Sequence, residues 1–60
     1  MDKLTLAERV RKYRGENRLT QQQFADMAGV KRLVVIRAEK GGKLRAENEV
    51  KILNAIETKN

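Results

Sequence analysis

The chain has 60 residues, enough for one domain with a small core, because a domain this short buries only about 60% of the surface that its unfolded chain exposes. It contains no Cys, His, Ser, Trp or Pro, which excludes disulfides, zinc sites of the Cys/His kind and catalysis by serine, cysteine or histidine. We therefore expect a protein that is not an enzyme and that needs no metal or cofactor.

The net charge of +6 is unevenly distributed along the chain. Residues 31–45 hold six Lys and Arg against a single Glu. Such a segment attracts polyanions by counterion release, so nucleic acid and acidic membrane surfaces are both candidate partners, beside the plainer interpretation of a solvated cationic surface. The sequence has no apolar run long enough to span a membrane and its start lacks the apolar core of a signal peptide, so we expect a cytoplasmic location.

The first predicted helix begins after Thr5, where Glu8 three residues later completes a capping-box pattern. Apolar residues that recur at spacings of four and three predict its buried face: Leu6, Val10 and Tyr13. We expect this helix to fray over residues 15–18.

The same capping pattern recurs at Thr20 and Gln23 and predicts a second helix over about residues 20–28. Its inward face consists of Phe24, Ala25 and Ala28, and Gly29 is suited to the positive φ that often ends a helix. A helix this short is not stable alone in water, so it depends on packing against its neighbours.

Residues 30–40 are compatible with a strand or a helix. The run 33–36 is apolar and mostly β-branched, and Gly41-Gly42 beyond it would suit the turn of a hairpin. A helix would instead place three apolar residues on one face and Gly41 just past its last turn. Those three residues are Val30, Val35 and Ala38. The local sequence leaves both structures open.

A last helix is predicted over residues 46–57 from apolar residues at helical spacing. They are Ala46, Val50, Leu53 and Ile56, with Ile52 widening the stripe. We expect residues 58–60 to fray at the chain end.

Two short helices joined at a glycine, with basic residues on the second, are typical of a helix-turn-helix, whose second helix enters the DNA major groove. Four segments resemble the phage Cro and repressor (lambda-repressor-like) type of helix-turn-helix DNA-binding domain: RVRKYR at 9–14, LTQQQFA at 19–25, AGV at 28–30 and EKG at 39–41. The resemblance covers about residues 5–56. It implies an all-α domain of four or five helices over residues 1–60, with a recognition helix at about 31–40; an α+β fold with a C-terminal hairpin around Gly41-Gly42 stays as the alternative.

The resemblance also implies roles for individual residues. The positions that point at base edges are Arg32, Leu33 and Arg37; an arginine can donate two hydrogen bonds to guanine, whereas a leucine can only pack against a group such as a thymine methyl. Contacts to DNA phosphates are implied for Gln21, which also braces the recognition helix, and for Lys40, Lys43 and Arg45. Lys31, which departs from the family, is expected to reach a phosphate as well. Arg14 and Glu39 match an ion pair that joins the first helix to the end of the recognition helix, worth on the order of 0–1 kcal/mol if exposed.

Three positions depart from the family pattern. Lys31 stands where the family usually has Ser or Thr, which removes about 1 kcal/mol of helix capping. Arg18 replaces a glycine, so we expect Asn17 to adopt the left-handed conformation. Ile36 stands at a position that is usually small or polar and makes residues 33–36 an apolar patch on the expected DNA face.

The resemblance therefore implies a sequence-specific regulator of transcription that binds double-stranded DNA, a repressor of phage or mobile-element type in the prokaryotic cytoplasm or nucleoid. We expect a homodimer, because one small module buries too little surface for tight specific binding, with the interface at Ile52 and Ile56 or at residues 33–36. Neither a membrane nor a metal is an expected partner. The main rival is a module that binds another protein through residues 33–36, and a third possibility is an antitoxin-like regulator.

Overall fold

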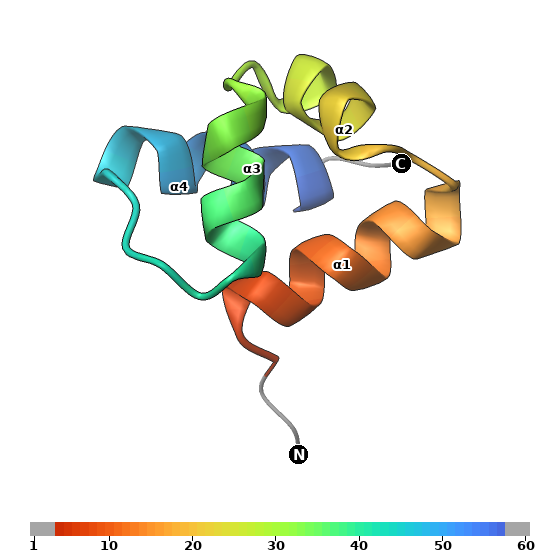
Figure 1. Cartoon of the computed structure of the whole chain (residues 1–60), viewed down its shortest axis with the longest axis horizontal. Helices are drawn as coiled ribbons and strands as arrows, with labels where there is room; N and C mark the ends of the chain where they lie inside the picture. Colours follow the sequence, from red (N-terminus) through yellow and green to blue (C-terminus); the bar gives the residue numbers. More distant parts are fainter. Residues whose placement is uncertain (1–3, 58–60) are drawn as a thin grey trace.

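The computed structural model describes residues 4–57, which form four α-helices and no strand (Figure 1). The helices are α1 (Leu6–Asn17), α2 (Gln21–Ala28), α3 (Arg32–Glu39) and α4 (Ala46–Glu57). The predicted all-α fold is confirmed, and the alternative hairpin around Gly41-Gly42 is wrong, since both glycines lie between two helices. The expected fraying of residues 58–60 lies outside the described residues.

Two reciprocal threonine caps start α1 and α2 as the sequence predicts. The Thr5 hydroxyl accepts a hydrogen bond from the Glu8 N–H at 3.2 Å, and the Glu8 carboxylate accepts one from the Thr5 N–H at 2.9 Å. Thr20 and Gln23 make the same pair of bonds at 3.0 and 2.9 Å. Each cap satisfies N–H groups that the first turn of a helix leaves without a partner.

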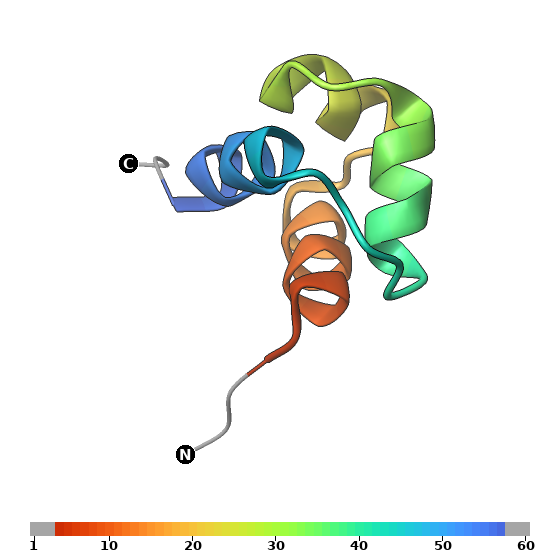
Figure 2. The ribbon, with the colours of Figure 1, turned by 90° about the vertical axis from the view of Figure 1, so that its left-hand side faces the viewer.

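Each helix contributes at least one fully buried side chain to a single core. The core residues are Val10, Phe24, Ala25, Val35, Ala38 and Ile52. The Tyr13 ring meets the Phe24 ring edge-on, with the ring centroids 5.9 Å apart. α3 contacts both α1 and α2, and α4 contacts the same two helices. In Figure 2, α3 lies at one side of the core and α4 at the other, so α3 keeps a long outward face.

Burial decides that residues 32–39 are helical. Val35 and Ala38 lie three residues apart, and both are buried in the core. In a helix this spacing puts both side chains on one face, whereas in a strand it would put them on opposite faces. The gain from burying both residues outweighs the β-propensity of the run 33–36.

The predicted inward face of α4 is right at Ile52, a core residue, and at Ile56, which packs against the core, and wrong at Ala46 and Val50. Ile52 is fully buried, whereas Val50, which the prediction placed inward, is 53% exposed and Ala46 is exposed as well. Successive residues of a helix are about 100° apart, so Val50 and Ile52 point in nearly opposite directions. Both faces fit a helical period, and the packing of α4 against α1 and α2 decides which of them is covered.

The end of α1 also differs from the prediction. α1 continues to Asn17 without fraying, and Arg18, not Asn17, adopts the left-handed conformation, with φ 53° and ψ 49°. The Asn17 amide donates to the Tyr13 carbonyl at 2.9 Å, and the Leu19 N–H donates to the Arg14 carbonyl at 2.9 Å. Closing the helix with that second bond requires the residue before Leu19 to be left-handed.

Candidate functional site

The outward side of α3 and the loops that flank it carry the excess positive charge. We call the six cations there the basic face: Lys31, Arg32, Arg37, Lys40, Lys43 and Arg45, all exposed. Within residues 4–57 the ion pairs join Arg9 to Glu57 and Arg14 to Glu39, so neither uses a cation of the basic face. Without an ion-pair partner among residues 4–57, these cations are available to attract an external anion.

Two shallow hollows join cations of α3 to cations of the loop that follows it. Arg37 of α3 lines one hollow with Lys43 and Arg45 of the following loop. Lys31, at the start of α3, lines another with the same Arg45, where Glu47 is the one acidic side chain among the described residues. The basic face is therefore one continuous surface that runs from the start of α3 to the loop before α4.

Two glycines shape the chain directly after α3. Gly41 has a φ of +79°, which lets the backbone turn sharply. The Gly42 N–H then donates to the Arg37 carbonyl at 2.9 Å, and a Cβ atom at position 42 would lie 2.7 Å from Arg37 Cγ. The missing side chain at Gly42 is thus what leaves room for the stem of Arg37 on the basic face.

The other side of α3 is held by a hydrogen-bonded ion pair. Arg14 of α1 donates from Nε to Glu39 Oε2 at 2.6 Å and from Nη2 to Glu39 Oε1 at 3.1 Å. The third guanidinium nitrogen, Nη1, donates to the Leu19 carbonyl at 3.0 Å. The side chains of Arg14 and Glu39 are only 24% and 9% exposed, so solvent screens this bidentate pair weakly. The pair therefore contributes more stability than the roughly 0–1 kcal/mol expected of an exposed ion pair.

Two further residues complete this anchor of α3. Gln21, the half-buried first residue of α2, donates from Nε2 to Glu39 Oε1 at 3.0 Å. Arg11 donates to the backbone carbonyl of Glu39. Sequence reasoning missed Arg11, although it lies three residues before Arg14, the spacing that puts two side chains on the same helix face. α1 and α2 together therefore fix where the last turn of α3 lies.

The anchor shifts the titration of Glu39. Burial raises the pKa of the Glu39 carboxyl, but hydrogen bonds from Arg14 and Gln21 and the positive charges of Arg14 and Arg11 outweigh that effect. The pKa of Glu39 consequently lies below its ordinary value, and the carboxylate stays ionised at neutral pH.

The start of α3 lacks the side-chain cap that α1 and α2 have. Lys31 occupies the N-cap position with extended backbone angles, and its side chain makes no capping hydrogen bond. Lys31 and Arg32 are both exposed there, beside Leu33, which is 68% exposed. The structure thus places the base-reading candidates on the outward face of α3, while Gln21 contacts the inner side of the last turn.

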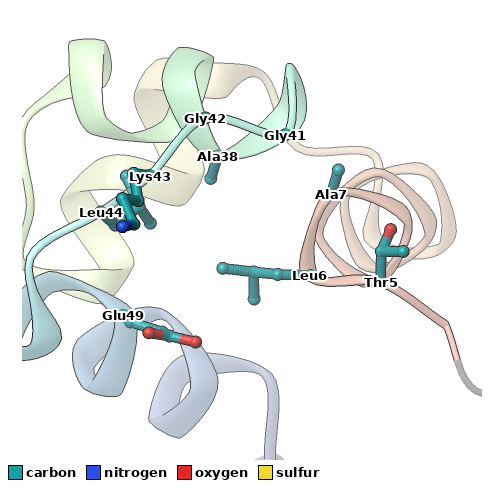
Figure 3. Close-up of a pocket in the computed structure, with 9 residues that line it drawn as sticks. All are labelled: Thr5, Leu6, Ala7, Ala38, Gly41, Gly42, Lys43, Leu44 and Glu49. Atoms are coloured by element: carbon teal, nitrogen blue, oxygen red, sulfur yellow. The ribbon is translucent and has the colours of Figure 1, made fainter.

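A third hollow, with a volume of about 460 Å³, adjoins the basic face at Lys43 (Figure 3). Leu6 points into it from α1, and Lys43 and Glu49 supply its ionisable side chains. The Thr5 hydroxyl at its edge already accepts the capping hydrogen bond from Glu8. This hollow therefore offers no activated nucleophile.

Two further properties of the described residues bear on function. Among residues 4–57, no group of three His, Cys, Asp or Glu side chains could hold a metal ion. None of the helices α1 to α4 has the length and apolar character needed to cross a membrane.

Comparison with known proteins identifies the arrangement of α2 and α3. A family model described as helix-turn-helix matches residues 10–59, which include both helices and the turn at Gly29. Gly29 has a φ of +80°, and its N–H donates to the Ala25 carbonyl at 2.8 Å, which ends α2 and starts the turn. A comparison with curated proteins found no match for the chain.

Proposed function

The chain belongs to the helix-turn-helix family, in the Cro and repressor type, and from this premise we propose that it regulates transcription by binding a specific site in double-stranded DNA. The family consists of DNA-binding regulators and not of enzymes. The observation that carries the proposal is the basic face, whose six cations have no ion-pair partner among residues 4–57. We further propose that residues 1–60 act as one DNA-binding domain.

The dimensions of α3 suit the major groove. An α-helix with its side chains is about 10–12 Å across, and the major groove of B-DNA is about 12 Å wide. With its outward face in the groove, α3 would present Arg32, Leu33 and Arg37 to base edges. The anchor at Glu39 supports this role, because it holds the helix in one orientation before DNA arrives.

Phosphate contacts would position the domain on the duplex. Lys31 at the start of α3 and Lys40, Lys43 and Arg45 after it flank the base-reading residues. Gln21 uses one amide N–H for Glu39 and has a second N–H with which it can donate to a phosphate. Such contacts fix register and orientation without reading sequence.

We propose the finer role of a homodimeric repressor of phage or mobile-element type in the prokaryotic cytoplasm or nucleoid. A dimer would read two half-sites about one helical turn apart, because a single module of this size buries too little surface for tight specific binding. Of the two residues suggested for an interface on the last helix, Ile52 is fully buried in the core and cannot contribute. Ile56 is half-buried and keeps some accessible surface.

The test is selection of bound duplexes from a randomised DNA library at about 0.1 M salt. An enriched inverted repeat with half-sites about ten base pairs apart is the expected result. Selection without any enriched sequence would refute the proposal of a sequence-specific regulator.

Two variants then separate the proposed roles on the selected duplex. Arg37→Ala should cost about 1–3 kcal/mol and relax the preference at one base pair. Lys43→Ala should weaken all duplexes to the same degree and lower the salt slope by about 1. If both variants weaken every sequence equally, Arg37 does not read a base.

The exposure of Leu33 favours a second candidate function, in which residues 33–36 bind a protein, as in an antitoxin-like regulator. A defined complex through this surface and no retardation of DNA at low salt are its expected results. Retardation that survives Leu33→Ser and Ile36→Ser but not Arg32→Ala would contradict it.

A further inference from the structure

Two apolar residues, Leu33 and Ile36, lie among the cations of the basic face, and attraction between charges does not explain why they are there. Leu33 is 68% exposed, more than any other large hydrophobic residue described; Val50, Met27 and Leu4 follow at 53%, 47% and 44%. Ile36 follows Leu33 by three residues, so the two side chains are neighbours on one helix face. Ile36 is half-buried and presents only part of its side chain.

The apolar pair lies in a hollow whose other side chains are cationic. Leu33 and Ile36 line a hollow of about 330 Å³ together with Arg37, Lys40 and Gly42. A partner that fills this hollow must offer an apolar group to the pair and negative charge or acceptors to the cations within a few ångströms. The major groove of DNA meets both conditions, because pyrimidine 5-methyl groups lie there between guanine acceptors and the flanking phosphates.

We propose that Leu33 and Ile36 read pyrimidine 5-methyl groups in the major groove, next to a guanine that Arg37 binds. The inference rests on the proposed function and specifies the chemistry of that same site. The methyl group belongs either to thymine or to 5-methylcytosine, which present it at the same ring position. In the second case, methylation of the DNA would regulate binding.

Desolvation makes Leu33 and Ile36 disfavour a polar base edge and favour a methyl group. A leucine or isoleucine side chain has no hydrogen-bonding atom, so a polar base edge placed against it loses water without gaining a partner. A methyl group in the same place gains from burial. Arg37 lines the same hollow, and its stem is positioned over Gly42, so its donors are adjacent to the methyl and suit guanine O6 and N7.

The experiment measures the affinity of the purified chain for the duplex selected from the random library and for versions with single methyl groups removed or added. In the first arm each thymine is replaced by deoxyuridine, which deletes only the methyl group. In the second arm each cytosine is replaced by 5-methylcytosine, which adds one. At a contacted position we expect an approximately fourfold loss in the first arm or an approximately fourfold gain in the second.

The two arms identify the source of the methyl group. A loss confined to particular thymines assigns thymine, and a gain at particular cytosines assigns 5-methylcytosine. If the selected duplex binds with the same affinity in every version, the proposal is overturned while the proposed function stands. If no duplex is selected at all, the proposed function fails and this inference fails with it.

A double-mutant cycle connects the methyl group to the side chain. In Leu33→Ala the effect of the sensitive methyl should fall below about twofold, because the partner of that methyl is gone. Met27→Ala truncates an exposed side chain of similar size on α2 and should keep the full methyl effect. Since Leu33 is exposed, its truncation should leave the thermal unfolding midpoint unchanged. A Leu33→Ala variant that retains the full methyl effect would show that another residue reads the methyl and would overturn the assignment.

Discussion

Glu39→Gln removes one negative charge from the anchor of α3 and leaves the size of the side chain nearly unchanged. In the wild-type protein both carboxylate oxygens accept hydrogen bonds, Oε2 from Arg14 and Oε1 from Arg14 and Gln21. A glutamine side chain replaces one of these oxygens with an NH₂ group. A donor then faces the donors of Arg14 or Gln21, so at least one of the three hydrogen bonds must be lost.

The expected loss of stability is about 2 kcal/mol, because a hydrogen bond to a charged group contributes about 1.5–3 kcal/mol. The Glu39 side chain is only 9% exposed, so water replaces the lost bond poorly. A domain of this length has a total unfolding free energy of about 3–9 kcal/mol, so the loss is a large fraction of it. In thermal unfolding the midpoint should fall by about 8–16 °C.

Urea unfolding at pH 7, followed by far-UV circular dichroism, measures this loss. Glu57→Gln is the matched control, since Glu57 pairs with Arg9 at 3.2 Å but the two side chains are 59% and 34% exposed. That variant should lose less than about 0.5 kcal/mol, because solvent screens an exposed ion pair. Equal losses in the two variants would refute the argument that burial makes the Glu39 anchor important.

The same variant tests the titration of Glu39. Because folding lowers the pKa of this carboxyl below its ordinary value of 4.5, the folded state favours the ionised form. The stabilisation is therefore complete at pH values above 4.5 and is lost as the pH falls through the pKa of the folded state. Wild-type stability should decline more steeply on acidification than that of Glu39→Gln, and parallel declines would contradict the lowered pKa.

Three further substitutions probe α1, the core and the basic face. Gly15→Ala should stabilise the protein by about 0.5–1 kcal/mol in urea unfolding, since α1 is helical at Gly15 and nothing lies within 4 Å of the added methyl. Val35→Ala should destabilise it by about 1–3 kcal/mol without changing the selected DNA sequence, because Val35 is fully buried. Gly42→Ala should displace Arg37 and relax the preference at the same base pair as Arg37→Ala, and an unchanged selected sequence would contradict the role given to this glycine.

Features that depend on neighbours in the sequence were predictable. The caps at Thr5 and Thr20 form as expected, because the two partners in each cap are three residues apart and meet whenever a helix starts there. The end of α2 at Gly29 is equally local. The six cations of the basic face all lie within residues 31–45, so the charge of that segment alone predicted a polyanionic partner.

The sequence was less informative where a residue could face either of two directions. Residues 33–36 have strand propensity, and the burial of Val35 and Ala38 makes them helical. On α4, Val50 and Ile52 both belong to stripes of helical period, and packing against α1 and α2 selects Ile52. Hydrophobic periodicity identifies an amphipathic helix but does not identify which of two apolar stripes is covered.

The sequence by itself determined where α1 and α2 start, that the chain is basic between residues 31 and 45, and that it has no Cys or His for disulfides, histidine catalysis or zinc sites of the Cys/His kind. The tertiary structure decided the left-handed turn at Arg18, the contact of Arg11 with Glu39 and the room that Gly42 leaves for Arg37. The physical reason is that helix capping and net charge depend on residues a few positions apart. The turn at Arg18, the contact of Arg11 with Glu39 and the room for Arg37 depend on which helices pack together. Local sequence does not determine that packing, because it forms only when the whole core is buried.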